Sequence, residues 1–399
     1  MNIKNYSIVT ASYWGFTLTD GALRMLVLLY FHTLGYSPVS LAFLFLLYEF
    51  CGIFTNLLGG WIGSRIGLKF TLYAGLTLQI AALLMLSFLN PAWASVLSVS
   101  YVMTSQALSG IAKDLTKMSS KSAVKLLAPD NQGSLFKWVA LLTGSKNALK
   151  GAGFLLGGLL LTQLGFTGAL WFMAAGLLIV LLASIFFLNQ DIGRSKQKVK
   201  FSQLFSKSPA INWLSAARTF LFASRDVWFV VALPIFLTEH LQWNFNQVGS
   251  FMAAWVIGYG IVQASAPRFA RSQQLNRGVS VWVFALVVTT LVLATLMQLA
   301  ISPVLTLIIG LAVFGIIFAI NSAVHSYLVL AFTSQDQVSL NVGFYYMANA
   351  CGRLLGTLLS GVIFLWGGLT ACLWVSAGLL VLAALCSLPL SFNKEIARV

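Results

Sequence analysis

The sequence predicts an all-α, polytopic membrane protein whose twelve transmembrane helices form two pseudo-symmetric halves of six. Three observations lead to this fold class. The chain is 59% hydrophobic and only 8% charged over 399 residues, a composition outside the range of soluble globular domains. Its apolar stretches reach the roughly 20 residues that a helix needs to cross a bilayer. Charged and glycine-rich segments of the first half also return in the second half at a nearly constant spacing.

The apolar stretches define the helices in chain order, separated by short polar or glycine-containing segments. We expect spans at 7–33, 39–62, 70–90, 93–112, 136–164, 167–188, 211–238, 247–266, 279–300, 304–330, 338–366 and 369–390. The first half then covers 1–189, a basic cytoplasmic linker 190–209, and the second half 210–399. The N-terminus, MNIKNYSIVT, leads into the first span without a small-residue cleavage site, so we expect no cleavable signal.

The net charge of +15 follows membrane topology. Lysines and arginines fall in alternate loops and at the termini, as in the runs 113–125 and 194–207, whereas the loops near Gly35, Asn90 and Gly165 contain none. This positive-inside bias predicts that both termini are cytoplasmic. We therefore expect the loop charges to contact anionic lipid and not nucleic acid.

The fifth span carries two lysines in its middle. Lys146, Lys150, Gly153 and Gly157 fall on one narrow face of a helix with 3.6 residues per turn. A lysine at the bilayer centre costs at least ~2.5–3.5 kcal/mol, so such residues face the bundle interior or a water-filled cavity. The pattern predicts a cavity in which an anion binds.

The eleventh span repeats this segment. The stretch from Lys146, KNALKGAGFLLGG, aligns with the stretch from Asn349, NACGRLLGTLLSG, and Lys150 then matches Arg353. Two parallel six-helix repeats are a common plan of secondary transporters, which hold their substrate near the midplane between the repeats.

Carboxylates also lie within the spans. Asp20 and Arg24 are one turn apart, so they either form an internal ion pair or act separately, with Arg24 on the substrate and Asp20 as a proton carrier. Glu49 either pairs with Arg24 or titrates as a desolvated carboxyl group. Asp226 follows Asp20 by 206 positions, at the equivalent place in the second half.

Other polar residues occupy the seventh and tenth spans. Arg218 and Arg225 share a face; we expect Arg218 to snorkel to the cytoplasmic edge and Arg225, which lies deeper, to be a ligand candidate. Asn321 and His325 are one turn apart. His325 either titrates near neutral pH or simply bonds its neighbours.

Cations outnumber carboxylates inside the predicted spans. We expect Lys113 and Lys117 to form a solvated or lipid-facing run at the inner membrane edge. The remaining six cations are Arg24, Lys146, Lys150, Arg218, Arg225 and Arg353, against the carboxylates Asp20, Glu49 and Asp226. The excess of three predicts an anionic substrate.

Two motifs and the repeated plan resemble the major facilitator superfamily. The loop after the second span, GWIGSRIGLK from Gly60, is similar to its cytoplasmic signature of spaced glycines and basic residues, with Ser64 in place of the usual aspartate. The stretch GFLLGG from Gly153 resembles its antiporter signature, with Phe154 in place of proline. The resemblance implies that four of these residues act in conformational gating: Gly60, Arg65, Gly153 and Gly157.

Longer stretches resemble the bacterial organoarsenical efflux permeases of arsenic-resistance operons. They are FTLTDGALRMLVLLYFHTLGYSP, LAFLFLLYEFCGIFTNLLGGW, QALSGIAKDLTKMSSKSAVK and LFKWVALLTGSKNALKGAGF, all within the first half. The resemblance implies a protein of the bacterial inner membrane that exports 1-arseno-3-phosphoglycerate. It also implies a functional partnership with glyceraldehyde-3-phosphate dehydrogenase, which makes this compound when arsenate replaces phosphate.

The residues themselves suggest the site of such a transporter. We expect substrate binding by Lys150, Arg353, Lys146, Arg24, Arg225, Asn349 and His325. We expect proton coupling by Asp20, Glu49 and Asp226. The same charges would also suit a transporter or exchanger of other phosphorylated organic anions, and the fold would suit a drug- or sugar-type exporter.

Several other classes of function lack sequence support. There is no nucleotide-binding glycine loop, so we expect secondary transport without ATP. The three histidines are far apart and no nucleophile–base constellation is present, so we expect no enzyme activity. The four cysteines lack metal-ligand spacing, so we expect no metal site. We also expect no other cofactor and a monomeric protein.

Overall fold

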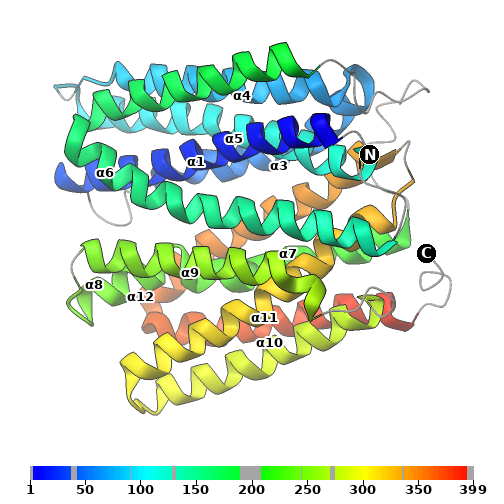
Figure 1. Ribbon diagram of the computed structural model, residues 1–399. Helices are drawn as coiled ribbons and strands as arrows, with labels where there is room; N and C mark the ends of the chain where they lie inside the picture. The colour runs from blue at the N-terminus through cyan, green and yellow to red at the C-terminus, as the bar shows by residue number, and fades with distance from the viewer. Residues whose placement is uncertain are drawn as a thin grey trace. The chain divides into compact units, whose positions relative to one another are not determined.

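The computed structural model describes residues 3–36, 43–90, 92–127, 132–188, 208–243, 245–269, 275–334 and 337–392. Every regular element in these ranges is a helix, which confirms the predicted all-α class (Figure 1). The first half contains α1 (Ile3–Thr33), α3 (Leu46–Ile66), α4 (Leu68–Ser87), α5 (Ser95–Leu127) and α6 (Gln132–Phe187). The second half contains α7 (Pro209–Phe229), α8 (Ala232–Glu239), α9 (Phe245–Ser265), η2 (Ala266–Arg268), α10 (Leu275–Gln298), α11 (Pro303–Ala331) and α12 (Val338–Phe392).

Two of these helices are each made of two membrane-crossing arms. Helix α6 breaks at Gly165 (φ 67°, ψ −178°), and α12 breaks at Gly367 and Gly368, the latter with φ 64°. Positive φ favours glycine because it has no Cβ. The 56 and 55 residues of α6 and α12 therefore each supply two of the predicted spans.

Seven segments of the described chain are long and apolar enough to cross a membrane, and two of these seven are the double-armed helices. Helices α1, α3 and α5, of 31, 21 and 33 residues, are also long enough to cross but carry buried charges. Together these segments account for the twelve predicted spans.

The seventh span is divided into α7 and α8 by a proline. Pro234 has no N–H to donate to the carbonyl of Val230, so the helix cannot continue regularly through this turn. The Ser360 hydroxyl of α12 accepts a hydrogen bond from the freed N–H of Ala232 at 3.1 Å. A side chain of a neighbouring helix thus satisfies the backbone where it breaks, as a membrane interior requires.

Large apolar side chains point away from the packed interior. Phe186, Ile179, Leu365 and Trp366 are among the most exposed, with Trp366 82% exposed. Apolar surface of this extent is unfavourable in water but suits contact with lipid tails.

The chain packs into two compact units. Unit 1 comprises Met1–Leu135, Ser145–Phe205 and Ser334–Met347; unit 2 comprises Phe136–Gly144, Ser206–Thr333 and Ala348–Val399. Phe136–Gly144, near the start of α6, belongs to unit 2, and the first turns of α12 belong to unit 1. These two segments occupy equivalent positions in the sequence repeat, so the division of the chain into units follows the same pattern in both halves. The linker at 190–209 lies outside the described residues except for Ser208 and Pro209, and the predicted domain boundaries stay a prediction.

Each unit has its own apolar core. In unit 1, Leu23 and Leu26 of α1 pack with Leu83 of α4 and with Phe166 and Leu170 of α6. The core of unit 2 is aromatic: the ring of Trp228 meets that of Phe314 edge-on at 5.1 Å, and Phe314 stacks on Phe318. These cores hold the helices that carry the charged residues described next.

Candidate functional site

A buried ion pair joins α1 to α6 in unit 1. The Lys150 ammonium lies 3.5 Å from Oδ2 of Asp20, and the two side chains are 13% and 4% exposed. The Tyr48 hydroxyl of α3 donates a hydrogen bond to the other oxygen of this carboxylate. The Lys150 charge is therefore compensated from a neighbouring helix, which a search for acids on its own helix does not find.

Glycines allow this pair to form. A Cβ at Gly153 would meet the backbone at Leu18, Gly21 and Ala22 of α1, and a Cβ at Gly157 would meet the carbonyl of Ala22. Small residues at such positions let helix backbones approach closely in membranes. Gly153 and Gly157 thus support the α1–α6 contact, and their gating role stays a prediction.

The Arg24 guanidinium lies 3.2 Å from Oε1 of Glu49. This contact confirms one of the two alternatives for Glu49. No Asp20–Arg24 ion pair occurs among the contacts that the structure describes; the cation that pairs with Asp20 there is Lys150. The Arg24 guanidinium also lies over the ring of Tyr48, 4.8 Å from its centre.

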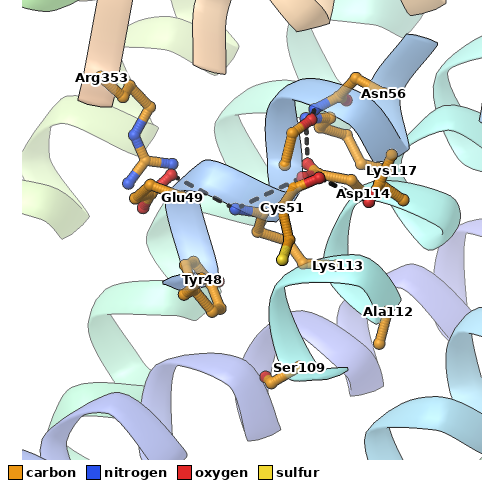
Figure 2. A network of polar contacts seen from close by, with 12 residues as sticks. Tyr48, Glu49, Cys51, Asn56, Ser109, Ala112, Lys113, Asp114, Lys117 and Arg353 are labelled. Atoms are coloured by element: carbon orange, nitrogen blue, oxygen red, sulfur yellow. Dashed lines mark hydrogen bonds and ion pairs between the residues drawn. The ribbon is translucent and has the colours of Figure 1, made fainter. Parts of the chain in front are cut away.

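Beyond Glu49, the ion pairs continue along α5 (Figure 2). The Lys113 ammonium is 3.6 Å from Oε2 of Glu49 and 3.7 Å from Oδ2 of Asp114, and Lys117 pairs with Oδ1 of Asp114. The Lys113 ammonium also lies 3.9 Å from the centre of the Tyr48 ring. The unit 1 network is defined here as Asp20, Arg24, Glu49, Lys113, Asp114, Lys117 and Lys150.

This arrangement corrects the expectation that Lys113 and Lys117 form a solvated or lipid-facing run. Both side chains are only 12% exposed, and the Asp114 side chain is 1% exposed. The cause is the length of α5, which continues to Leu127, well past the span end predicted at residue 112. Asp114 was missed for the same reason, although its position between two lysines in KDLTK was a signal for an ion pair.

The equivalent pair recurs in unit 2. Nε of Arg353 on α12 lies 3.3 Å from Oδ2 of Asp226 on α7. Arg225 donates from Nε to Oδ1 of the same carboxylate at 2.7 Å. Gly356, one turn beyond Arg353, packs against Ala223 and Asp226. The residues matched by the sequence repeat therefore form the same ion pair in each half.

A second polar cluster lies in unit 2. Nε of Arg218 donates to Oδ1 of Asn349 at 2.9 Å, and Nη1 donates to the Ser322 hydroxyl at 3.0 Å. The amide of Gln263 also donates to that hydroxyl, at 3.2 Å. Arg218 is 3% exposed, so the predicted snorkelling to the membrane edge is wrong. Neutral side chains of α11 and α12 hold the guanidinium inside the unit, and Gln263 of α9 bonds to one of them, Ser322.

Asn321 and His325 lie beside this cluster on α11. Their exposed fractions are 0% and 1%. Neither the amide nitrogen nor the amide oxygen of Asn321 has a hydrogen-bond partner within the described chain, and the same holds for Nδ1 of His325. Sequence reasoning proposed His325 as a site residue but did not identify Asn321 as the more exceptional of the two.

The remaining predicted residues are placed as follows. Lys146 is half-buried one turn before Lys150. Arg65 is exposed and lies over the ring of Trp61 at 5.0 Å. A Cβ at Gly60 would meet the backbone of Ser339 and Gly343 within unit 1, so α3 and α12 approach closely there. That the cations of the two halves line one cavity stays a prediction.

Among the described residues, no three histidine, cysteine or acidic side chains gather closely enough to hold a metal ion. The ion pairs and hydrogen bonds described above offer ammonium and guanidinium groups that can contact an anion.

The sequence matches the Major Facilitator Superfamily over residues 8–230 and again over residues 214–397. The chain belongs to the major facilitator superfamily. The two matches correspond to the two halves of this transporter, so the repeat found in the sequence is the repeat of the superfamily. No curated protein matches this superfamily member significantly.

Solved structures agree with this assignment of the fold. The human organic anion transporter MFSD10 (TETRAN) has a TM-score of 0.77 at 16% identity, over 96% of this chain and 99% of the other. A bacterial homologue of the iron transporter ferroportin, in an outward-facing state with soaked iron, has a TM-score of 0.75 at 15% identity, over 97% and 99%. The proton:xylose symporter XylE, bound to 6-bromo-6-deoxy-D-glucose, has a TM-score of 0.76 at 14% identity, over 96% and 94%. At these identities the likeness shows the fold and leaves the substrate of this transporter open.

Proposed function

We propose that this transporter exports 1-arseno-3-phosphoglycerate across the bacterial inner membrane, coupled to protons, and so confers resistance to arsenate. The resemblance of the first half to organoarsenical efflux permeases supports the substrate and the direction. The observation that carries the proposal is the surplus of cations on the helices of each unit.

The surplus can be counted from the ion pairs. The unit 1 network joins four cations to three carboxylates, and in unit 2 two arginines share Asp226. Lys146 and Arg218 add one further cation to each unit. Each unit therefore carries an excess of two positive charges in these groups. A phosphate ester carries about −1.5 to −2 near neutral pH, and an arsenate ester is similar, so a doubly esterified glycerate has the complementary charge.

The ion pairs also suggest how substrate and proton are coupled. If the substrate takes over Lys150 and Arg353, it displaces the carboxylates of Asp20 and Asp226 from these cations. A buried carboxylate without its cation is costly, and protonation removes that cost. Binding of the anion would then favour protonation of the displaced carboxylates, and this dependence is the proposed coupling between substrate and proton.

The similar structures give limited support for the substrate class. One is named an organic anion transporter, which agrees with an anionic cargo, whereas others are named for iron and xylose. The proposal therefore rests on the charges of this chain and on the resemblance to the arsenical permeases.

Everted membrane vesicles test the proposal because export then appears as uptake. The vesicles would receive glyceraldehyde 3-phosphate, NAD⁺, radiolabelled arsenate and purified glyceraldehyde-3-phosphate dehydrogenase. We expect arsenic uptake that requires both the dehydrogenase and this transporter, and that collapses when the proton gradient is dissipated. Uptake of labelled 3-phosphoglycerate at the same rate without arsenate would instead favour an exchanger of ordinary phosphorylated anions. Vesicles that take up neither compound would refute the proposal.

A further inference from the structure

We infer that Asn321 and His325 form a subsite that recognises a hydroxyl group next to the oxyanion of the transported ligand. This inference deepens the proposed function and rests on it. It starts from polar atoms that are fully buried but have no partner in the described chain.

Buried polar groups in folded proteins nearly always have a hydrogen-bond partner, and an exception calls for an explanation such as a bound water or ligand. Asn321 is 0% exposed, and its amide can offer two donors and an acceptor, none of them used within the described residues. Nδ1 of His325, one turn along α11, is unsatisfied in the same way. The two residues lie on one face of the helix, so both can reach a single small group.

The chemistry of these atoms indicates what they bind. An amide presents a donor and an acceptor side by side, and a neutral imidazole nitrogen supplies one or the other. Neither group carries a fixed charge, so an oxyanion of the ligand would bind more strongly to the guanidinium of the nearby Arg218. A hydroxyl group, which both donates and accepts, is the complementary ligand group.

The guanidinium of Arg218 places the proposed hydroxyl subsite near a positive charge. Ser322, which follows Asn321 and lies one turn before His325 on α11, accepts a hydrogen bond from the Arg218 guanidinium at 3.0 Å. A ligand hydroxyl at Asn321 would thus lie beside a positive charge. The ligand class is an organic oxyanion with a hydroxyl on the adjacent carbon, as in glycerate and its phosphate or arsenate esters.

Two probes that differ by one hydroxyl test this inference: 3-phosphoglycerate and 3-phosphooxypropanoate, which lacks the 2-hydroxyl. Binding of each to the purified full-length protein would be measured by isothermal titration calorimetry. A site built around a ligand hydroxyl rejects the analogue without it, because the polar groups of the site then stay unpaired. We expect the wild type to prefer 3-phosphoglycerate by about tenfold to a hundredfold.

The Asn321→Ala variant should bind the two probes almost equally. Its thermal stability should be unchanged or higher, because the amide makes no hydrogen bond that the substitution would remove. His325→Ala provides a second, independent variant in case the first does not fold. Thr290→Val is the matched control: Thr290 is buried in α10 with its hydroxyl bonded to its own helix at Leu286, so the preference should remain.

Three outcomes would overturn the inference: no preference in the wild type, no binding of 3-phosphoglycerate, or a preference that survives in both variants. The last would mean that other groups recognise the hydroxyl and that Asn321 and His325 are satisfied in another way, such as by a structural water. Arsenate resistance of cells carrying the wild-type transporter is scored separately. A failed inference with intact resistance would therefore leave the proposed function standing.

Discussion

Removing the Lys150 charge should destabilise the protein, and removing the Asp20 charge as well should restore it. At 3.5 Å, two unit charges attract by about 5 kcal/mol if the effective dielectric constant is ~20. Breaking one partner out of a buried pair typically costs about 3–5 kcal/mol, because it leaves an uncompensated charge. We expect Lys150→Met to lose this amount of unfolding free energy. The double variant Asp20→Asn/Lys150→Met should lie within about 1 kcal/mol of the wild type, since replacement of a whole buried pair is often neutral.

Thermal unfolding of the detergent-solubilised protein provides the assay, with the fluorescence of its 12 tryptophans as the signal. At roughly 2–4 °C per kcal/mol for a unit of this size, the single variant should melt on the order of 10 °C below the wild type. Lys137→Met is the matched control, because Lys137 is an exposed lysine on the same helix. Its melting temperature should stay within a few degrees of the wild type.

Transport separates the two roles of the pair. We expect cells carrying either the Lys150→Met variant or the double variant to be sensitive to arsenate, although the double variant is stable and present in the membrane. The reasoning would be refuted if Lys150→Met were as stable as Lys137→Met, or if Asp20→Asn failed to rescue it. Resistance in the double variant would show that the pair is structural and that the substrate binds elsewhere.

Three further predictions concern the same helices. Arg353→Met should abolish arsenate resistance. It should cost about 1.5–3 kcal/mol of unfolding free energy, less than Lys150→Met, because Arg225 still neutralises the Asp226 carboxylate. An equal loss of stability for the two variants in the same melting assay would argue against this sharing. Gly153→Ala should lower the melting temperature because its Cβ would meet the α1 backbone, whereas Gly176→Ala, with no atom within 4 Å, should not; equal effects would contradict the close packing. Asp114→Asn should destabilise by about 3–5 kcal/mol, since two lysines lose a buried carboxylate, and a neutral result would mean that water screens them.

The fold and one ion pair were predictable because their causes are local or repeated in the sequence. Hydrophobic length predicts spans, and the match of Lys150 to Arg353 predicts equivalent positions in the two halves. The Arg24–Glu49 contact could be proposed because few carboxylates are available inside the membrane. These inferences need no knowledge of how far each helix extends beyond the bilayer.

The incorrect predictions concern charged residues near the predicted ends of the spans. Hydropathy ends the fourth span at residue 112, but α5 continues, and Lys113, Asp114 and Lys117 are buried within unit 1. Arg218 was assigned to the membrane edge for a similar reason, although amide and hydroxyl side chains from other helices hold it inside. Partners supplied by tertiary packing decide whether a charge is solvated or buried, and a single sequence does not specify them.

The recurrence of one ion pair in both units bears on its role. Lys150 with Asp20 and Arg353 with Asp226 differ in the chemistry of the cation, yet both pairs lie where a glycine brings two helices close together. A buried ion pair is weak evidence for stability, because a well-packed apolar pair often stabilises as much or more. Stability alone therefore gives little reason to keep the same costly pair in both halves while the surrounding side chains differ. Alternating access does give a reason, since each half must hold the substrate while it binds and must neutralise the vacated cation after release. In the proposed mechanism the aspartate against each cation would perform the second task, and its protonation while the substrate is bound would couple transport to protons.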